Sequence, residues 1–140
     1  MSYLIDTGVV CEAVRPRPAA SVLRWLRSVP DSALHLSVLS VGELRSGIEE
    51  LGEGARKERL RLWLEQELPA WLGDRLLPIT PAVADRWGRL AGEAGQPVAA
   101  IDSLIAATAI VHGLRLVTRN SNDFAFGGLE VINPWEVGAR

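Results

Sequence analysis

Four carboxylic acids occupy comparable places in this sequence, because each one ends a short apolar run or lies near the start of the segment that follows. They are Asp6, Glu43, Asp102 and Asp123. In open α/β sheets, functional sites form at the carboxyl ends of the strands. If the strands are parallel, all four acids emerge at the same edge of the sheet. We therefore predict a single acidic site that contains all four.

Such an acidic site requires a cation. Carboxylates that converge within a few ångströms repel one another, and some of them would be forced to hold protons. A divalent cation removes this conflict. Because the acids offer oxygen ligands, with no His or Cys beside any of them, Mg²⁺ or Mn²⁺ fits better than Zn²⁺. An ion of this kind can activate a water molecule and stabilise charge on a phosphoryl group during in-line displacement.

Each acid also has a purely structural interpretation. Asp6 and Asp102 are both well placed to cap the N-terminus of a following helix. Asp123 lies in a loop rich in Asn and Ser, where Asp commonly stabilises turns, and Glu43 resembles an ordinary solvated helix residue. The joint placement favours the acidic site, because four independent structural roles would not require the same edge of the sheet.

The elements that must position these acids alternate between short strands and helices. Strands are expected at Tyr3–Asp6, Leu34–Ser37, Leu76–Ile79, Arg115–Val117 and Glu130–Ile132. Helices are expected at Ser21–Ser28, Val38–Leu51, Ala55–Leu72, Pro81–Ala94 and Ala99–His112. Thr80 followed by Pro81 is a typical start signal for the helix at Pro81–Ala94. This alternation is typical of an α/β fold with a mainly parallel central sheet. The length of 140 residues predicts that 1–140 form a single domain.

Composition and charge argue against several other classes of protein. A hydrophobic content of 48% and a charged content of 23% are those of a globular rather than a disordered chain. The lone Cys11 excludes an intrachain disulfide, and a structural zinc site is not expected. The net charge of −2 disfavours a protein that coats DNA through a global positive field. With neither a signal-like start nor a membrane-length apolar stretch, we expect a cytoplasmic protein without membrane contact.

The sequence resembles PIN-domain ribonucleases of the VapC/FitB kind, the toxins of toxin–antitoxin pairs. The resemblance runs from "LIDTGVVCEAVRP" through "LSVLSVGELRSGI" and "AAIDSLIAATAIVHGLRLVTRNSNDF" to "VINPW". It implies a three-layer α/β/α sandwich, a Mg²⁺- or Mn²⁺-dependent endoribonuclease site, homodimerisation and inhibition by a cognate antitoxin protein. The acidic site of the family maps to Asp6, Glu43, Asp102 and Asp123, and the residues that would support it by hydrogen bonding are Thr118 and Asn120.

Three further features bear on function. The family commonly has Asn, or another small polar residue, where this chain has Gly8, so a polar contact to a metal-bound water or to phosphate is missing. Arg119 is the best candidate for a contact to an RNA phosphate, with surface solubility as its alternative role. The charged helix expected at Ala55–Leu72 is most simply a solvated helix, but it becomes a candidate antitoxin groove if its apolar stripe is exposed.

The leading hypothesis is an endoribonuclease toxin in which metal-activated water attacks a phosphodiester. In the proposed site Asp6 and Asp102 bind the metal most directly, while Glu43 and Asp123 orient waters or a second ion. The alternative is a catalytically weak or inactive PIN-like scaffold that binds RNA or a partner protein. A phospho-acceptor enzyme is disfavoured, because such sites generally need a basic residue and the sole Lys57 lies far from any strand end.

Overall fold

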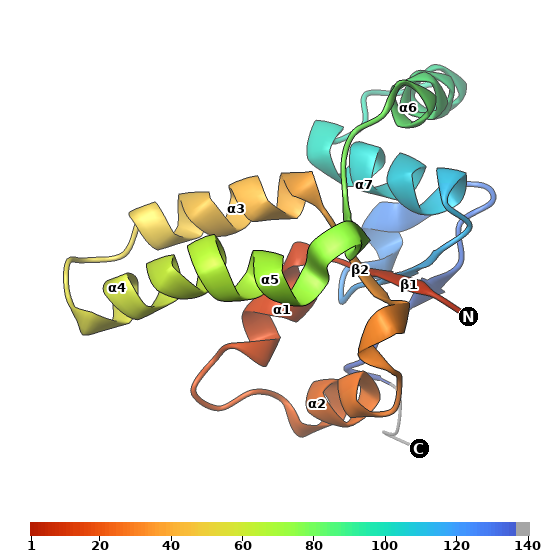
Figure 1. Cartoon of the computed structure of the whole chain (residues 1–140). Helices are drawn as coiled ribbons and strands as arrows, with labels where there is room; N and C mark the ends of the chain where they lie inside the picture. Colours follow the sequence, from red (N-terminus) through yellow and green to blue (C-terminus); the bar gives the residue numbers. More distant parts are fainter. Residues whose placement is uncertain (137–140) are drawn as a thin grey trace.

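A sheet of five parallel strands lies at the centre of the computed structural model, which describes residues 1–136 (Figure 1). The strand order is β3-β2-β1-β4-β5. The strands are β1 (Tyr3–Ile5), β2 (Leu34–Ser37), β3 (Leu76–Leu77), β4 (Arg115–Val117) and β5 (Val131–Ile132). All five fall within the segments that the sequence predicts. The first strand lies in the middle of the sheet, where it pairs with both β2 and β4.

Helices connect these strands. They are α1 (Thr7–Ala13), α2 (Ala20–Arg27), α3 (Val38–Glu49), α4 (Ala55–Leu62), α5 (Leu68–Leu72), α6 (Pro81–Glu93) and α7 (Ala100–Val111). The π-helical segment η2 (Trp63–Glu67) joins α4 to α5, and the short 3₁₀ turns are η1 (Asp31–Ala33), η3 (Gly73–Arg75) and η4 (Ser121–Phe124). Within the described residues, no helix has both the length and the apolar character needed to cross a membrane.

The helices cover both faces of the sheet, which confirms the α/β/α sandwich. On β1, Ile5 packs into one apolar core with residues of α1 to α5, and Leu4 packs into the other with residues of α6 and α7. This alternation follows from the two-residue period of a strand. In Figure 1, α6 and α7 lie together on one side of the strands, and α1 and α2 lie on the other. Apolar runs buried on both faces are typical of parallel sheets.

The helix α1 is absent from the sequence-based expectations. Gly8 and the β-branched residues Val9 and Val10 have poor helix propensity, so the pattern at 7–13 does not indicate a helix. The helix forms because Val9 and Val10 are buried in the core and because Asp6 caps its first turn. Tertiary packing therefore overrides local propensity at this position.

Two helix ends follow from their sequence signals. The Thr80 hydroxyl accepts a hydrogen bond of 3.2 Å from the backbone N–H of Val83, so the Thr-Pro pair starts α6 as expected. The helix α7 stops before Gly113, whose φ of 65° lies in the left-handed region that glycine adopts without strain. This turn leads the chain directly into β4.

The helix expected at Ala55–Leu72 is interrupted by the π-helical segment η2. Pro69 lies in the first turn of α5 and has no backbone N–H, so it cannot donate the hydrogen bond that a regular helix needs there. Leu64, Leu68 and Leu72 of the same segment are buried in the core. The segment therefore keeps one apolar side against the protein although its hydrogen-bond pattern changes.

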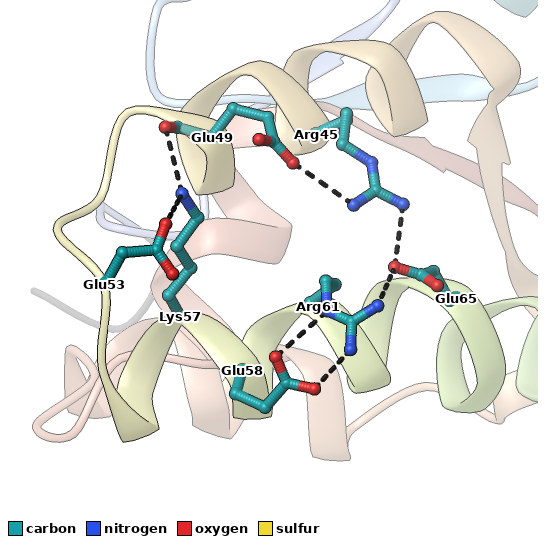
Figure 2. Close-up of polar contacts among 7 residues, drawn as sticks. All are labelled: Arg45, Glu49, Glu53, Lys57, Glu58, Arg61 and Glu65. Carbon is teal, nitrogen blue, oxygen red and sulfur yellow. Dashed lines mark hydrogen bonds and ion pairs between the residues drawn. The ribbon is translucent and has the colours of Figure 1, made fainter.

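An ion-pair network fastens α3 to this neighbouring helical segment, as Figure 2 shows. Arg45 of α3 lies 3.6 Å from Glu49 and 3.0 Å from Glu65, and Glu65 also lies 3.5 Å from Arg61. Arg61 pairs in turn with Glu58. Partly exposed pairs of this kind contribute about 0–1 kcal/mol each. The network thus connects α3, the helix that carries Glu43, to α4 and η2, and it adds little to the stability of the fold.

Candidate active site

Asp6 is buried at the carboxyl end of β1, with 9% of its surface exposed. Its Oδ1 accepts a hydrogen bond of 2.8 Å from the backbone N–H of Thr7, and its Oδ2 accepts one of 2.8 Å from the hydroxyl of Thr118. A buried carboxylate costs several kcal/mol unless donors compensate for the lost water. Both oxygens of Asp6 have such a donor. The capping interpretation of Asp6 is therefore correct, and it is compatible with a place in the acidic site.

The loop after β4 is organised around Thr118. Its hydroxyl oxygen accepts a hydrogen bond of 3.1 Å from the backbone N–H of Asn120 while donating to Asp6. The carbonyl of Asn120 in turn accepts one of 2.9 Å from the N–H of Asp123, which lies exposed in η4. A continuous set of hydrogen bonds thus runs from the end of β1 to the start of the loop that carries Asp123.

Glu43 reaches the same region from α3. Its Oε1 lies 2.6 Å from Oγ1 of Thr7, and this hydroxyl also lies 2.8 Å from Oγ of Ser40, which is fully buried. Thr7 is a site residue that the sequence motifs do not single out. The available signal was its position directly after the acid at a strand end, where its side chain meets the helix that follows the neighbouring strand β2.

Asp102 lies in the first turn of α7 and is half-buried. Burial raises the pKa of Asp102, and the negative charges of Asp6, Glu43 and Asp123 raise it further. The capping interpretation of Asp102 is wrong: Ala99 occupies the cap position of α7, and in the described part of the chain no side chain makes a capping hydrogen bond there. The charges of the other three predicted acids thus act together on Asp102.

A cavity of about 760 Å³ opens beside two of these acids. Its lining includes Asp102, from the start of α7, and Asp123, from η4, whereas Asp6 and Glu43 lie outside its lining in the described structure. The other polar side chains that line it are Glu93, Gln96 and Asn122. The cavity is therefore lined by carboxylates and carboxamides next to the acidic cluster, with room for a substrate group.

The donor set fits a hard divalent cation. The four acids supply only oxygen, and their mutual charge, seen in the raised pKa of Asp102, is what a cation would offset. Within residues 1–136, however, no three His, Cys, Asp or Glu side chains lie close enough to hold an ion jointly. Mg²⁺ in proteins is usually bound by one or two carboxylates together with waters and substrate phosphates. A spacing of the acids that is too wide for three of them to hold one ion agrees with binding by one or two carboxylates.

Two other positions singled out by the sequence lie next to the cluster. Arg119 is exposed, follows Thr118 directly, and places its guanidinium 5.1 Å from the centre of the Trp135 ring. Its backbone carbonyl accepts a hydrogen bond of 3.2 Å from Asn133, so the closing "INPW" segment holds this loop. At Gly8, an added Cβ would meet no described atom within 4 Å. A larger side chain has room there.

Comparisons with known proteins agree with this architecture. Residues 3–126 match the family model described as PIN domain. The chain is similar to Toxin FitB of Neisseria gonorrhoeae, with 37% identity over 135 residues that cover 94% of this chain and 97% of FitB. It is also similar to VapC ribonuclease Y4jK of Sinorhizobium fredii, with 34% identity over 136 residues that cover 95% and 97% of the two chains.

A solved structure shows the same arrangement of elements. The crystal structure of FitAcB from Neisseria gonorrhoeae superposes with a TM-score of 0.86 at 37% identity, covering 95% of this chain and 98% of that chain. The match of fold, of sequence over nearly the whole chain and of the family model leads to one conclusion. The chain belongs to the PIN domain family.

Proposed function

We propose that this protein is an endoribonuclease and the toxin of a toxin–antitoxin pair. Two findings support the proposal: Thr7 contacts both Asp6 and Glu43, and the charges of Asp6, Glu43 and Asp123 help to raise the pKa of Asp102. The similarity to a toxin and to a VapC ribonuclease supports RNA as the substrate.

We further propose that the site uses Mg²⁺ or Mn²⁺. Asp6 and Asp102 would hold the ion most directly, and Glu43 and Asp123 would orient waters or a second ion. When bound, such an ion supplies an activated water and neutralises charge that develops on a phosphodiester. Oxygen-only ligands and the electrostatic repulsion at Asp102 support this choice of metal.

The chain's own residues would prepare this chemistry by fixing the acids. The two hydrogen bonds to Asp6 hold both of its carboxylate oxygens in place, one from the backbone N–H of Thr7 and one from the hydroxyl of Thr118. Asn120 would support the site through the loop that its backbone joins to Thr118. Arg119 offers a guanidinium whose planar fork suits an RNA phosphate, and its position over Trp135 limits its motion.

The remaining features of a toxin are also part of the proposal. We expect residues 1–140 to act as one PIN-like domain in the cytoplasm, as a homodimer that a cognate antitoxin protein inhibits. The apolar stripe of the segment at 55–72 is mostly buried, but Trp63 and Trp71 line an apolar pocket of about 170 Å³ together with Val10, Val14 and Leu26. This pocket is our candidate for part of the antitoxin contact.

Cleavage of single-stranded RNA by the purified full chain tests the proposal. With added Mn²⁺ the wild type should cleave, and a chelator should stop the reaction. The variant Asp6→Asn should lose on the order of 100-fold or more, because even outer-sphere partners of a metal site are commonly worth 10–100-fold. The matched control is Asp85→Asn, an exposed acid of α6 paired with Arg89, which should cleave as the wild type does.

Two outcomes would contradict the nuclease proposal. Equal cleavage by the wild type and Asp6→Asn would show that the activity does not come from this site. RNA binding without any Mn²⁺-dependent cleavage would instead favour the inactive scaffold that binds RNA or a partner protein.

A further inference from the structure

We propose that Thr7 is a positioning residue that holds the carboxylates of Asp6 and Glu43 in a fixed relation to each other. The inference rests on the proposed function, because it concerns the same acids. Thr7 is not one of the acids or supporting residues of the sequence motifs. Its role follows from contacts made by both its backbone and its side chain.

Thr7 contacts both acids at hydrogen-bonding distance. Its backbone N–H donates to Oδ1 of Asp6 at 2.8 Å, and its Oγ1 lies 2.6 Å from Oε1 of Glu43. Asp6 comes from the end of β1, whereas Glu43 comes from α3, 36 positions beyond Thr7. One residue thus connects two acids that the chain brings together from separate elements.

The direction of the side-chain hydrogen bonds is fixed by chemistry. A carboxylate only accepts, so the hydroxyl of Thr7 must donate its single proton to Glu43. Oγ of Ser40 lies 2.8 Å from the same hydroxyl oxygen, and Ser40 must therefore be the donor in that contact. The result is a directed chain from Ser40 through Thr7 to Glu43. In such a chain each hydrogen bond polarises and strengthens the next.

This arrangement removes freedom that Glu43 would otherwise have. A glutamate on a half-buried helix position has three side-chain torsions, so its carboxylate can occupy several positions unless a contact selects one. The hydroxyl of Thr7 selects one of these positions, and the branched side chain of Thr7 is itself restricted at χ1. Glu43 is thereby preorganised relative to Asp6, which is a condition for precise sites.

Removing the hydroxyl of Thr7 tests whether it positions Glu43, without changing the place of Thr7 as the first residue of α1. Thr7→Val keeps the shape of the side chain and the backbone N–H that contacts Asp6, and it loses the hydroxyl that donates to Glu43 and accepts from Ser40. Thr7→Ser keeps the hydroxyl. The control is Thr108→Val on α7, because Thr108 is fully buried and its hydroxyl donates to the carbonyl of Leu104 at 2.8 Å, within its own helix.

Calorimetric titration of the metal-free full chain with Mn²⁺ is the test. We expect Thr7→Val to weaken Mn²⁺ binding by about 10-fold or more, in line with the usual effect of residues that orient metal ligands. Thr7→Ser should restore binding, and Thr108→Val should bind as the wild type does. In a Glu43→Gln background, Thr7→Val should weaken binding no further, because the two residues would act through one contact.

The possible failures are distinguishable. Unchanged Mn²⁺ binding by Thr7→Val, or the same loss in the Glu43→Gln background, would overturn the role of Thr7 and leave the proposed function intact. A wild type that neither binds Mn²⁺ nor cleaves RNA would overturn the proposed function and this inference with it. If Thr7→Val does not fold, Thr7→Ala removes the same hydroxyl with a smaller side chain, and normal Mn²⁺ affinity in that variant would overturn the role.

Discussion

The hydroxyl of Thr118, which follows β4, donates a hydrogen bond of 2.8 Å to Oδ2 of Asp6, which follows the adjacent strand β1. Both residues are buried, so neither partner can be replaced by water without a change in packing. The contact therefore joins two neighbouring strand ends and also compensates a buried charge. Stability and the proposed activity should depend on it together.

Replacing Thr118 with Val tests this dependence. The variant leaves one oxygen of a buried carboxylate without its donor, which should cost about 1.5–3 kcal/mol in the free energy of unfolding. Urea denaturation measures this loss, and cleavage of RNA should fall as well. Thr118→Ser keeps the hydroxyl and should recover most of the stability and most of the RNA cleavage. A Thr118→Val protein as stable as Thr118→Ser would mean that the hydroxyl contributes little.

The raised pKa of Asp102 predicts how stability depends on pH. Because burial and the neighbouring acids raise this pKa in the folded protein, the folded state holds the Asp102 proton more tightly than the unfolded state. The resulting stabilisation is complete below the ordinary Asp pKa of about 3.9, and it is lost as pH rises through the raised value. Above the raised value the ionised carboxyl therefore destabilises the metal-free fold.

Asp102→Asn should accordingly raise the melting temperature of the metal-free protein at neutral pH, and the difference should shrink as the pH falls toward about 4. Mn²⁺ should reverse the order, because a ligand present at 100 times its Kd stabilises the folded state by about 2.7 kcal/mol and Asp102→Asn would bind it poorly. Thermal melts across pH, with and without Mn²⁺, measure both effects. A lower melting temperature for Asp102→Asn at neutral pH would contradict this account.

Gly8 lies in α1 with open space around it. Gly8→Ala should stabilise the protein by about 0.5–1 kcal/mol, because glycine loses more conformational freedom than alanine when a helix forms. Gly8→Asn adds the polar side chain that the family commonly has at this place, and it should raise the rate of RNA cleavage above that of Gly8→Ala. Equal rates for the two variants would show that a polar group at this position does not assist the reaction.

Arg119 should contribute to RNA affinity through a phosphate. Removing one phosphate contact lowers the slope of log affinity against log salt by about 0.7 for a single strand. Arg119→Ala should show this change in fluorescence titrations with RNA in chelator, where no cleavage occurs. Arg56→Ala, an exposed arginine on α4, serves as the control. The same slope for Arg119→Ala and the wild type would remove Arg119 from the RNA contact.

The sequence predicted those elements whose formation depends on residues that are neighbours in the chain. Short apolar runs predicted all five strands, and the Thr80-Pro81 pair predicted the start of α6. The helix α1 and the π-helical segment η2 were not predicted, because the first depends on packing of Val9 and Val10 and the second on a change in hydrogen bonding before Pro69. These causes lie in tertiary structure or in backbone register rather than in residue pattern.

The same limit applies to the acidic site. The positions of the acids after strands indicated one edge of the sheet, but they did not indicate the distances between the carboxylates. Those separations depend on rotamers that distant residues select, as Thr7 does for Glu43. The assignment of the four acids as metal ligands stays a prediction that the titrations above will test.

The order of the strands has a consequence for synthesis of the protein on the ribosome. The first strand made, β1, needs β4 as one of its two neighbours, and the last of the four acids is residue 123 of 140. A nascent chain therefore cannot pair β1 with β4 or bring all four acids together until residue 123 has left the ribosome, so the fold and the acidic site are completed in the same late step.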